Sequence, residues 1–370
     1  MYSIATFNAN NFFLRYKFSR NIPNSFSKDS EIEAGQVIGF LPGLSFRKYT
    51  KNFIIWDKTR RELAAKALKE PENKLPDILC FQEVENIEAI RLFNQMYLNG
   101  YYKYSMLIDS YDPRNIDVGI LSTYPIQNVR SHIDDADPND NFIFSRDCLE
   151  VEVDLGNERI YLFLNHLKSK LVKRKSSDTD AQYNDKVKAS HEKRLKQAAT
   201  VIEYIEDRFN GFHDTALYAV IGDFNDTPYS PWIKPLIDSP RLFNVLDEFL
   251  SYDDRWTYYW KSKNRVSQID YFLVSEALRQ RISNTVNNHP DRAPHIERQG
   301  IGYRKLNSTG TDTLPKETNY YAFENDDVTP VNNAAPVAKK QNFRFNRYQE
   351  VLDDPKNNIS DHCPVKIWFD

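Results

Sequence analysis

Short, almost wholly apolar runs recur along this chain, and each one adjoins a cluster of polar side chains. The clearest run is 218–221, which is followed directly by Gly222 and Asp223. An apolar run of this length, ended by turn residues, indicates a strand buried on both faces. Such runs alternate with segments at helical spacing, most plainly at 187–209. This alternation is typical of α/β folds.

The segment after the run at 218–221 carries a carboxylate and an amide. Asp223 and Asn225 lie two residues apart, so in extended backbone both side chains point to one side. Pro228 then turns the chain away. A strand end of this kind suits a bound cation that carries a phosphate, although by itself it is more often a polar strand-to-loop turn.

Six such polar clusters occur in the chain. Five are predicted at strand ends and a sixth precedes the last strand: Asn8, Glu83, Asn165 with His166, Asp223 with Asn225, Asp270, and Asp361 with His362. If the strands share a sheet core, these ends converge on one rim. Oxygen-rich ligand sets suit Mg²⁺ or Mn²⁺, whereas Zn²⁺ more often draws on cysteine and several histidines. A hard cation beside a His–Asp pair fits hydrolysis of a phosphate ester.

The six clusters stand in the segments TFNANNF, CFQEVEN, NHLKSK, GDFND, IDYFLVS and SDHCPV. Together they resemble the endonuclease/exonuclease/phosphatase superfamily, in the family's order and across nearly the whole chain. The resemblance implies a deoxyribonuclease-I-like fold, an α/β four-layer sandwich of two packed mixed sheets flanked by helices. It also implies one domain over residues 1–370.

The resemblance implies a metal site on the first, second and last of these segments. Glu83 resembles the main metal ligand, and Asn8 and Asp361 resemble contributors to the same site. The implied cofactor is Mg²⁺ or Mn²⁺. Asn10 stands where some relatives carry an aspartate, so it is left out of the ligand set.

The remaining segments correspond to catalytic residues. Asp223 and Asn225 resemble the pair that positions the attacking water and the scissile phosphate. His362 resembles the catalytic histidine, with Asp270 as the carboxylate that orients its ring, and His166 resembles a histidine that contacts the phosphate. Whether Asp223 or the Asp270–His362 pair takes the proton from water stays open at this point.

The substrate class rests on NHLKSK and the basic residues around it. NHLKSK resembles the motif of bacterial endonucleases that act on DNA with little sequence preference. Lys168 begins a basic run that continues to Lys175, which could follow a phosphate backbone or form a solvated linker. Arg194, on the helix that follows, could reach the phosphate or face solvent.

Length and composition limit this interpretation further. Two polar stretches, at about 15–50 and 284–358, are predicted to be insertions in the domain. A formal charge of −3 gives no overall basic field, so contact with nucleic acid must rely on local patches. The three cysteines are widely spaced and suggest reduced core residues of a cytoplasmic protein; secretion stays open if a presequence has been removed.

The sequence therefore predicts a Mg²⁺- or Mn²⁺-dependent phosphodiesterase, specifically an endonuclease that cleaves DNA, with RNA also open. One alternative is a phosphoesterase that acts on a phospholipid or an inositol phosphate. Another is a catalytically silent binding module on the same fold. Neither a membrane span nor a protein partner is predicted.

Overall fold

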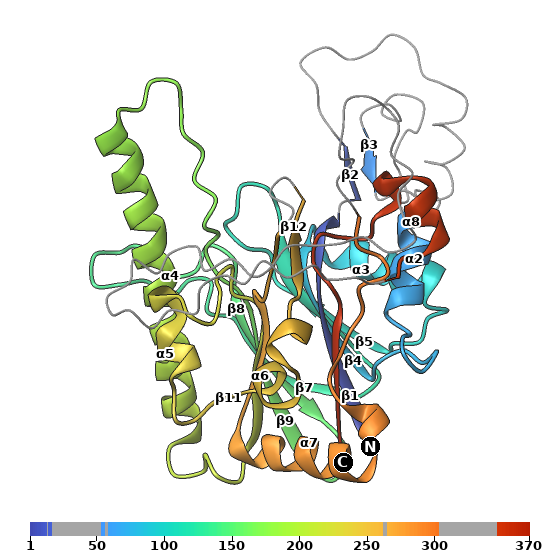
Figure 1. The fold of residues 1–370 in the computed structure, drawn as a ribbon. Helices are drawn as coiled ribbons and strands as arrows, with labels where there is room; N and C mark the ends of the chain where they lie inside the picture. The colour runs from blue at the N-terminus through green and yellow to red at the C-terminus, as the bar shows by residue number, and fades with distance from the viewer. Residues whose placement is uncertain (13, 17–52, 56–57, 262–264, 303–345) are drawn as a thin grey trace, which may run out of the picture.

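Two six-stranded sheets, packed face to face, form the centre of the computed structural model, which describes residues 1–12, 14–16, 53–55, 58–261, 265–302 and 346–370 (Figure 1). The first sheet contains, from edge to edge, β15 (His295–Ile296), β16 (Val365–Phe369), β1 (Tyr2–Phe12), β4 (Ile78–Val84), β6 (Asp117–Ser122) and β5 (Tyr104–Leu107). The second contains β11 (Phe243–Asn244), β14 (Asp270–Val274), β10 (Leu217–Asp223), β9 (Arg159–His166), β8 (Cys148–Asp154) and β7 (Ile126–Arg130). Both sheets mix parallel and antiparallel pairs.

The continuous apolar runs arise because the central strands are buried on both faces. In β1, Ile4 faces the core between the sheets, and Ala5 faces the core on the outer side. In β10, Ala219 and Val220 divide in the same way between the inner core and the outer core of the second sheet. Successive side chains of a strand point to opposite faces, so burial on both faces requires an unbroken apolar sequence.

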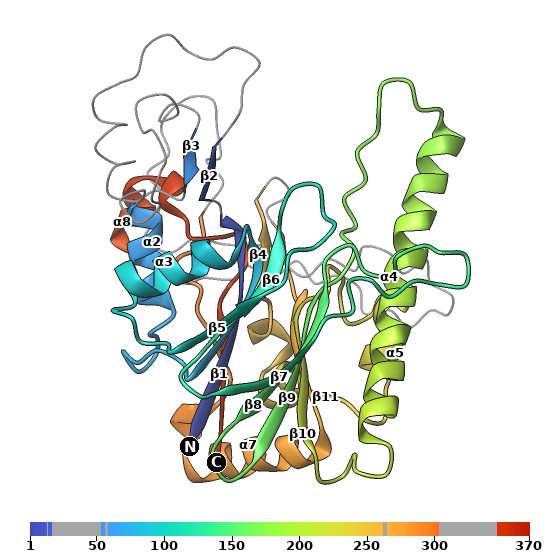
Figure 2. The same ribbon diagram turned by 180° about the vertical axis from the view of Figure 1, so that it is seen from behind.

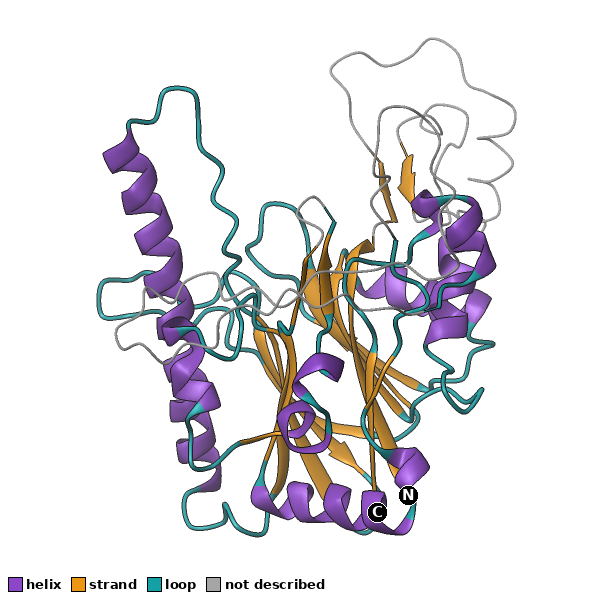
Figure 3. Cartoon of the chain, viewed as in Figure 1, coloured by secondary structure: helices purple, strands orange, loops and turns teal. Residues whose placement is uncertain are grey.

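Helices cover the outer faces of both sheets, which completes the four predicted layers (Figures 2 and 3). Helices α2 (Lys58–Ala67), α3 (Ile87–Tyr97) and α8 (Gln349–Asp353) pack on the first sheet, and α4 (Asp180–Phe209) and α5 (Lys234–Ile237) pack on the second. Helices α6 (Val245–Phe249) and α7 (Glu276–Asn288) contribute to the core between the sheets. Two small two-stranded antiparallel sheets, β2 (Leu14–Tyr16) with β3 (Phe53–Ile55) and β12 (Tyr258–Trp260) with β13 (Arg265–Ser267), complete the described strands. The prediction of an α/β four-layer sandwich is confirmed.

Helix α4 is longer than its apolar spacing indicated. It begins at Asp180, where Thr179 and Gln182 form a reciprocal capping box that satisfies two backbone N–H groups. Its first turns are mostly exposed and rise beyond the strands (Figure 1). A capped, charged extension of this kind has no apolar stripe, so the predicted helix began only where the stripe begins.

The two predicted insertions fall mainly outside the described residues. Residues 17–52 and 303–345 are not described, so the structure gives no account of most of 15–50 or of the centre of 284–358. The second range begins too early, because residues 284–288 belong to α7 and β15 pairs with β16 at the edge of the first sheet. In the described part of the chain, no helix combines the length and apolarity needed to cross a lipid bilayer. Cys80, Cys148 and Cys363 are buried free thiols, as predicted.

Strand register places the ends of three neighbouring strands side by side. Asp223 of β10 lies opposite His166 of the parallel strand β9 and opposite Asp270 of the antiparallel strand β14. Gly222, just before Asp223, adopts a φ of +128°, and a Cβ there would lie 2.1 Å from the Asn165 carbonyl oxygen. The sequence predicted that the strand ends at Gly222, but β10 continues through Asp223. Only glycine allows β9 and β10 to approach this closely.

We expect Gly222→Ala to lower the free energy of unfolding by roughly 2–4 kcal/mol, because the new methyl group adds a backbone clash to a strained φ. Gly156→Ala is the matched control. Gly156 also has a positive φ, +99°, but apart from its chain neighbours no described atom lies within 4 Å of its Cβ position. The control should lose only about 1–2 kcal/mol, the cost of the left-handed backbone. Urea unfolding measures both, and equal losses would contradict the importance of the close approach.

Candidate active site

The rim formed by β9, β10 and β14 carries His166, Asp223 and Asp270, all of them buried. The sequence predicted Asp270 at the end of a strand, but it is the first residue of β14. Because β14 is antiparallel to β10, the beginning of β14 lies at the same rim as the end of β10. The predicted convergence of these three side chains is confirmed. Asp270 differs only in reaching the rim from the beginning of its strand and not from the end.

Two bulges bring the ends of β1 and β4 to the same rim. The pairing register of β1 and β4 shifts between Asn8 and Phe12, and both Asn10 and Glu83 have left-handed backbone, with φ of 45° and 59°. Bulges of this kind redirect side chains at the edge of a site. The Glu83 carboxylate accepts a hydrogen bond from the Asn11 backbone N–H at 3.0 Å, so the two bulges are linked.

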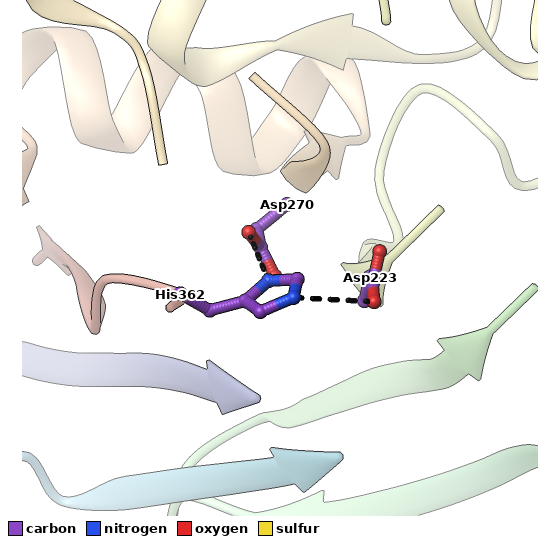
Figure 4. A group of neighbouring side chains, drawn as sticks. All are labelled: Asp223, Asp270 and His362. Atoms are coloured by element: carbon purple, nitrogen blue, oxygen red, sulfur yellow. Dashed lines mark hydrogen bonds and ion pairs between the residues drawn. The ribbon is translucent and has the colours of Figure 1, made fainter. Parts of the chain in front are cut away.

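His362 and Asp270 form a buried pair (Figure 4). The Nδ1 atom of His362 lies 2.9 and 3.1 Å from the two Asp270 carboxylate oxygens. Thr257 holds the carboxylate: its hydroxyl donates to Asp270 Oδ2 at 2.7 Å and accepts the Asp270 N–H at 3.0 Å. Backbone pairing of Cys363 N–H with the Thr257 carbonyl, at 2.7 Å, fixes the histidine segment beside this threonine.

The His362 ring binds its proton tightly. Burial alone would lower the pKa of the imidazole, but the Asp270 and Asp223 carboxylates outweigh burial and raise the pKa to about 10. Asp270 therefore orients the ring and stabilises its charged form. With Nδ1 on Asp270, the Nε2 atom is the one directed to the rim (Figure 4).

The Asp223 Oδ2 atom is the point on which the site converges. Its neighbours are four nitrogen atoms: Asn8 Nδ2 at 3.0 Å, Asn225 Nδ2 at 3.1 Å, His166 Nε2 at 3.4 Å and His362 Nε2 at 3.8 Å. The distance to His362 is too long for a hydrogen bond, so this imidazole and the carboxylate can both form hydrogen bonds to a bound molecule. Burial raises the pKa of the Asp223 carboxyl.

The backbone conformation that brings Asn225 to Asp223 was not predicted from the sequence. The prediction placed Asp223 and Asn225 in extended backbone, but Asn225 has a φ of 54°. Its N–H donates to Asp223 Oδ1 at 2.7 Å, which closes a tight turn, and its side chain also donates to the Leu167 carbonyl at 3.0 Å. The side chains do meet, because asparagine tolerates the left-handed region and bonds back to its own turn.

His166 differs sharply from His362 in its charge state. Burial, followed by the nearby Arg146 guanidinium, lowers the pKa of His166 well below its usual value. Its Nε2 also lies 3.8 Å from Glu83 Oε1, and among the described residues its buried Nδ1 has no hydrogen-bond partner. The rim therefore combines one neutral imidazole with one that is readily protonated.

Arg146 is a part of the rim that the sequence did not identify. It is almost fully buried, donates to Asp112 Oδ2 at 3.0 Å and donates to the Leu167 carbonyl, also at 3.0 Å. Arg114 binds the same Asp112 carboxylate at 3.1 and 3.2 Å. Both arginines lie in polar segments between strands, where no local pattern distinguishes a site residue from a solvated one.

The two predicted substrate-binding residues occupy different positions. Arg194 is fully buried; its Nε donates to Asp226 at 2.8 Å and its Nη1 donates to the Lys168 carbonyl at 2.7 Å. These contacts hold the loops that follow β9 and β10, so the structure gives Arg194 a positioning contact. The Lys168 side chain is only half-buried, and burial together with the positive charge of Arg146 lowers its pKa.

Two groups at the rim offer ligands for a cation. Asp223, Asp270 and His362 have ligand atoms within 4.8 Å of one another. The second group contains Glu83 and Asp361, joined through the bulge because Asn10 Nδ2 donates to Asp361 Oδ1 at 2.6 Å. Burial raises the pKa of Asp361, and nearby Asp223 raises it further. Carboxylate and amide donors of this second group match the preference of Mg²⁺.

The side chain of Asn8, a predicted metal ligand, is held by hydrogen bonds at the rim. Its Oδ1 accepts the Asn10 N–H at 2.9 Å, and its Nδ2 donates to Asp223, so both ends of the amide are engaged. Asn10, which was left out of the predicted ligand set, donates its Nδ2 to Asp361, and its Oδ1 accepts Asn11 Nδ2 at 2.8 Å, so this amide is engaged at both ends as well. Residue types alone could not predict these contacts, because they depend on the register shift between Asn8 and Phe12.

Known proteins provide an independent comparison. The model of the Endonuclease/Exonuclease/phosphatase family matches residues 5–362. No curated protein matches the sequence. The solved structure of beta toxin 275-280 from Staphylococcus aureus is 12% identical, covers 100% of both chains and gives a TM-score of 0.50, a likeness of fold alone.

Two other solved structures are similar to a smaller degree. Truncated Caenorhabditis elegans TDP2 is 12% identical over 99% of this chain and 95% of its own, with a TM-score of 0.46. Sphingomyelinase C from Streptomyces griseocarneus is 13% identical over 99% and 98%, with a TM-score of 0.44.

We expect His362→Ala to lower kcat by at least about 100-fold, the usual scale for a positioned acid or base. Asp270→Asn should lower kcat less, since it alters the support of the ring and leaves the ring in place. The double variant should be about as slow as His362→Ala, because the two residues act as a unit. Turnover of bis(p-nitrophenyl) phosphate measures these rates.

His295→Ala is the matched control for this series. His295 also pairs with a carboxylate, Glu297 at 3.2 Å, but lies on β15 at the edge of the first sheet. Its rate should stay within about twofold of the wild type, as for a surface substitution away from the site. Additive losses in the Asp270–His362 double variant would contradict the pairing.

Proposed function

This chain belongs to the endonuclease/exonuclease/phosphatase family, and we propose that it is a metal-dependent phosphodiesterase that hydrolyses DNA as an endonuclease. Membership of this family indicates a phosphoesterase-type hydrolase.

The observation that carries the proposal is the set of four nitrogen atoms around Asp223 Oδ2. One carboxylate oxygen cannot bond four donors, and the two imidazole contacts, at 3.4 and 3.8 Å, are at or beyond the usual limit. A phosphate oxygen beside Asp223 would share these donors. Hydrogen bonds that are already directed to the reacting group are the arrangement that stabilises charge in a transition state.

The side chains then divide the chemistry between them. Asp223, with its carboxylate held by Asn8 and Asn225, orients the water and accepts its proton. His362 carries a proton on Nε2, which it delivers to the leaving oxygen or holds against the phosphate. Its counterpart on the opposite side, the neutral His166, contacts a phosphate oxygen without adding charge.

The residues present fit a hard divalent cation. Glu83 and Asp361 would hold it, with Asn8 as the third ligand, and Asn10 would position the Asp361 carboxylate through its Nδ2. When bound, such a cation neutralises phosphate charge and polarises the oxygens. Asp223, Asp270 and His362 are less suitable as its main site, because Nδ1 of the imidazole is already bonded to both Asp270 oxygens.

A polyanionic substrate is favoured by the basic residues next to His166. Lys168 and Arg114 lie beside the rim, and Lys173, Arg174 and Lys175 are exposed on the loop before α4. The alternative substrates, a phospholipid or an inositol phosphate, need only the rim itself. A silent binding module is disfavoured, because every side chain that the chemistry needs is present and directed inward.

A panel of substrates tests the proposal. We expect cleavage of plasmid DNA with Mg²⁺ or Mn²⁺, no cleavage in EDTA, and little or none of sphingomyelin and inositol phosphates. RNA belongs in the same panel. Glu83→Gln should raise the Mg²⁺ concentration needed for half activity, because it removes a charged ligand while nearly preserving shape. Full activity in metal-free protein, or activity on sphingomyelin alone, would contradict the proposal.

The salt dependence of binding tests the exposed basic loop. Replacing Lys173, Arg174 and Lys175 by glutamine should flatten the plot of log affinity against log salt, by about 0.9 for each phosphate that the loop no longer neutralises. Because Arg174 already pairs with Asp180, we expect a change equivalent to about two phosphates. Lys103→Gln is the control, since Lys103 lies at the opposite end of β6, where its N–H donates to the Ser122 carbonyl at 3.1 Å. An unchanged slope in the triple variant would reduce the loop to a solvated linker.

A further inference from the structure

Two aromatic side chains, Tyr111 and Phe142, are exposed next to the rim. Tyr111 is 55% exposed and Phe142 is 46% exposed, yet the two rings stack with centroids 4.8 Å apart and planes at 20°. They come from loops far apart in the sequence, one before β6 and one before β8. Two large rings that touch both each other and water form an apolar surface without cover in the described structure.

Strand register places both loops at the active-site end of the sheets. Strand β6 begins at Asp117, opposite Val84 at the end of β4, and β8 begins at Cys148, opposite Asn165 near the end of β9. Each loop therefore starts from the rim that carries Glu83 or His166.

Side-chain contacts tie the aromatic pair to the residues that follow His166. Gln197 bridges the two parts: its Nε2 donates to the Ile143 carbonyl at 3.0 Å, and its Oε1 accepts the Lys168 N–H at 2.8 Å. On the other loop, Asp112 follows Tyr111 directly and holds Arg146, which donates to the Leu167 carbonyl. The rings are thus held in a fixed relation to the proposed phosphate site.

Three cations, Arg114, Lys168 and Lys193, here called the cationic strip, link the ring-bearing loops to the segment that follows His166. Lys193 Nζ donates to the Phe142 carbonyl at 3.2 Å, and Arg114 is bonded to Asp112 beside Tyr111. Burial lowers the pKa of Lys168, and the positive charges of Arg146, Arg114 and Lys193 lower it further against the opposing charge of Asp112, so these cations lie near one another. A strip of this kind attracts a phosphate backbone.

Acidic residues also lie near the rings. The Tyr111 hydroxyl donates to Asp134 at 2.6 Å, and Asp137 on the same loop pairs with Lys196 at 2.6 Å. These carboxylates would repel phosphates, so a bound strand must lay its backbone on the cationic strip and its bases against the rings. The same carboxylates disfavour insertion of this loop into a bilayer.

We propose that Tyr111 and Phe142 form a stacking platform for an unpaired base of a DNA strand whose phosphates follow Arg114, Lys168 and Lys193 into the site. The inference rests on the proposed function and deepens it, because it names single-stranded or frayed DNA as the preferred substrate. Bases inside an intact duplex are covered by their neighbours, so only an unpaired or terminal base offers its face to an aromatic ring.

Binding of a short fluorescent oligothymidylate with phosphorothioate linkages tests the platform without turnover. We expect Tyr111→Ala and Phe142→Ala each to raise Kd for this single strand by roughly 5- to 100-fold, the range for removal of one base–aromatic stack. Kd for a duplex with the same linkages should change less than about twofold, because the duplex offers no free base face. Tyr111→Phe, which keeps the ring and removes only the bond to Asp134, should bind the single strand nearly as the wild type does.

Phe212→Ala is the matched control. Phe212 is also an exposed aromatic residue, 68% exposed, but lies in the turn after the far end of α4. It should leave both affinities unchanged. Equal weakening for single strand and duplex, or no weakening for either, would overturn the platform.

Two further measurements separate this inference from the proposed function. If the wild type cleaves DNA while the ring variants bind the single strand normally, the platform is wrong and the nuclease activity stands. If the wild type cleaves no DNA, the proposed function fails, and the binding assay still reports on the rings. Cosedimentation with sphingomyelin–phosphatidylcholine vesicles is the third arm: weaker vesicle binding in the ring variants, with normal oligothymidylate binding, would assign the rings to a bilayer and overturn the proposal.

Discussion

The close approach of β9 and β10 at Gly222 is the constraint on which the site depends. It sets the register in which His166, Asp223 and Asp270 lie side by side on three adjacent strands. With those three fixed, the remaining groups need only arrive from the opposite sheet and from the last loop. The two bulges of β1 and β4, and the segment before β16, supply them. A packed pair of sheets therefore provides the rigid base, and short irregular segments provide the chemistry.

Buried charge dominates the energetics of this rim. Asp223, Asp270 and Asp361 are brought together where burial raises the pKa of each carboxyl, and His362 is the cation that stands among all three. Such a cluster is costly to keep ionised unless further positive charge is present. The fold accepts this cost by satisfying individual oxygens with Thr257, Asn8, Asn10 and Asn225. A divalent cation would complete the neutralisation that these neutral donors begin.

Sequence reasoning recovered most of the framework and the polar clusters, for identifiable physical reasons. Apolar runs buried on both faces, and the order of six motifs, predicted the two sheets, their helical layers and the meeting of residues such as Glu83, Asp223 and His362. It failed where geometry depends on backbone that leaves the regular strand. Asn225 turns back in left-handed conformation, Asp270 begins a strand, and Asn10, left out of the predicted site, bonds to Asp361. Arg146 and Thr257 were not identified, because contacts between distant segments leave no local pattern.

The left-handed backbone at Glu83 has a consequence for how this protein can change. A glutamate at a φ of 59° carries a local strain that glycine would not, and that asparagine would carry to a smaller degree. Glu83 is thus held in a backbone conformation that selection for thermal stability alone would not retain. Replacements there that relax the backbone would gain stability and lose the carboxylate together. In variants selected only for heat resistance, we therefore expect Glu83 to be replaced, which would give proteins that are more stable but inactive.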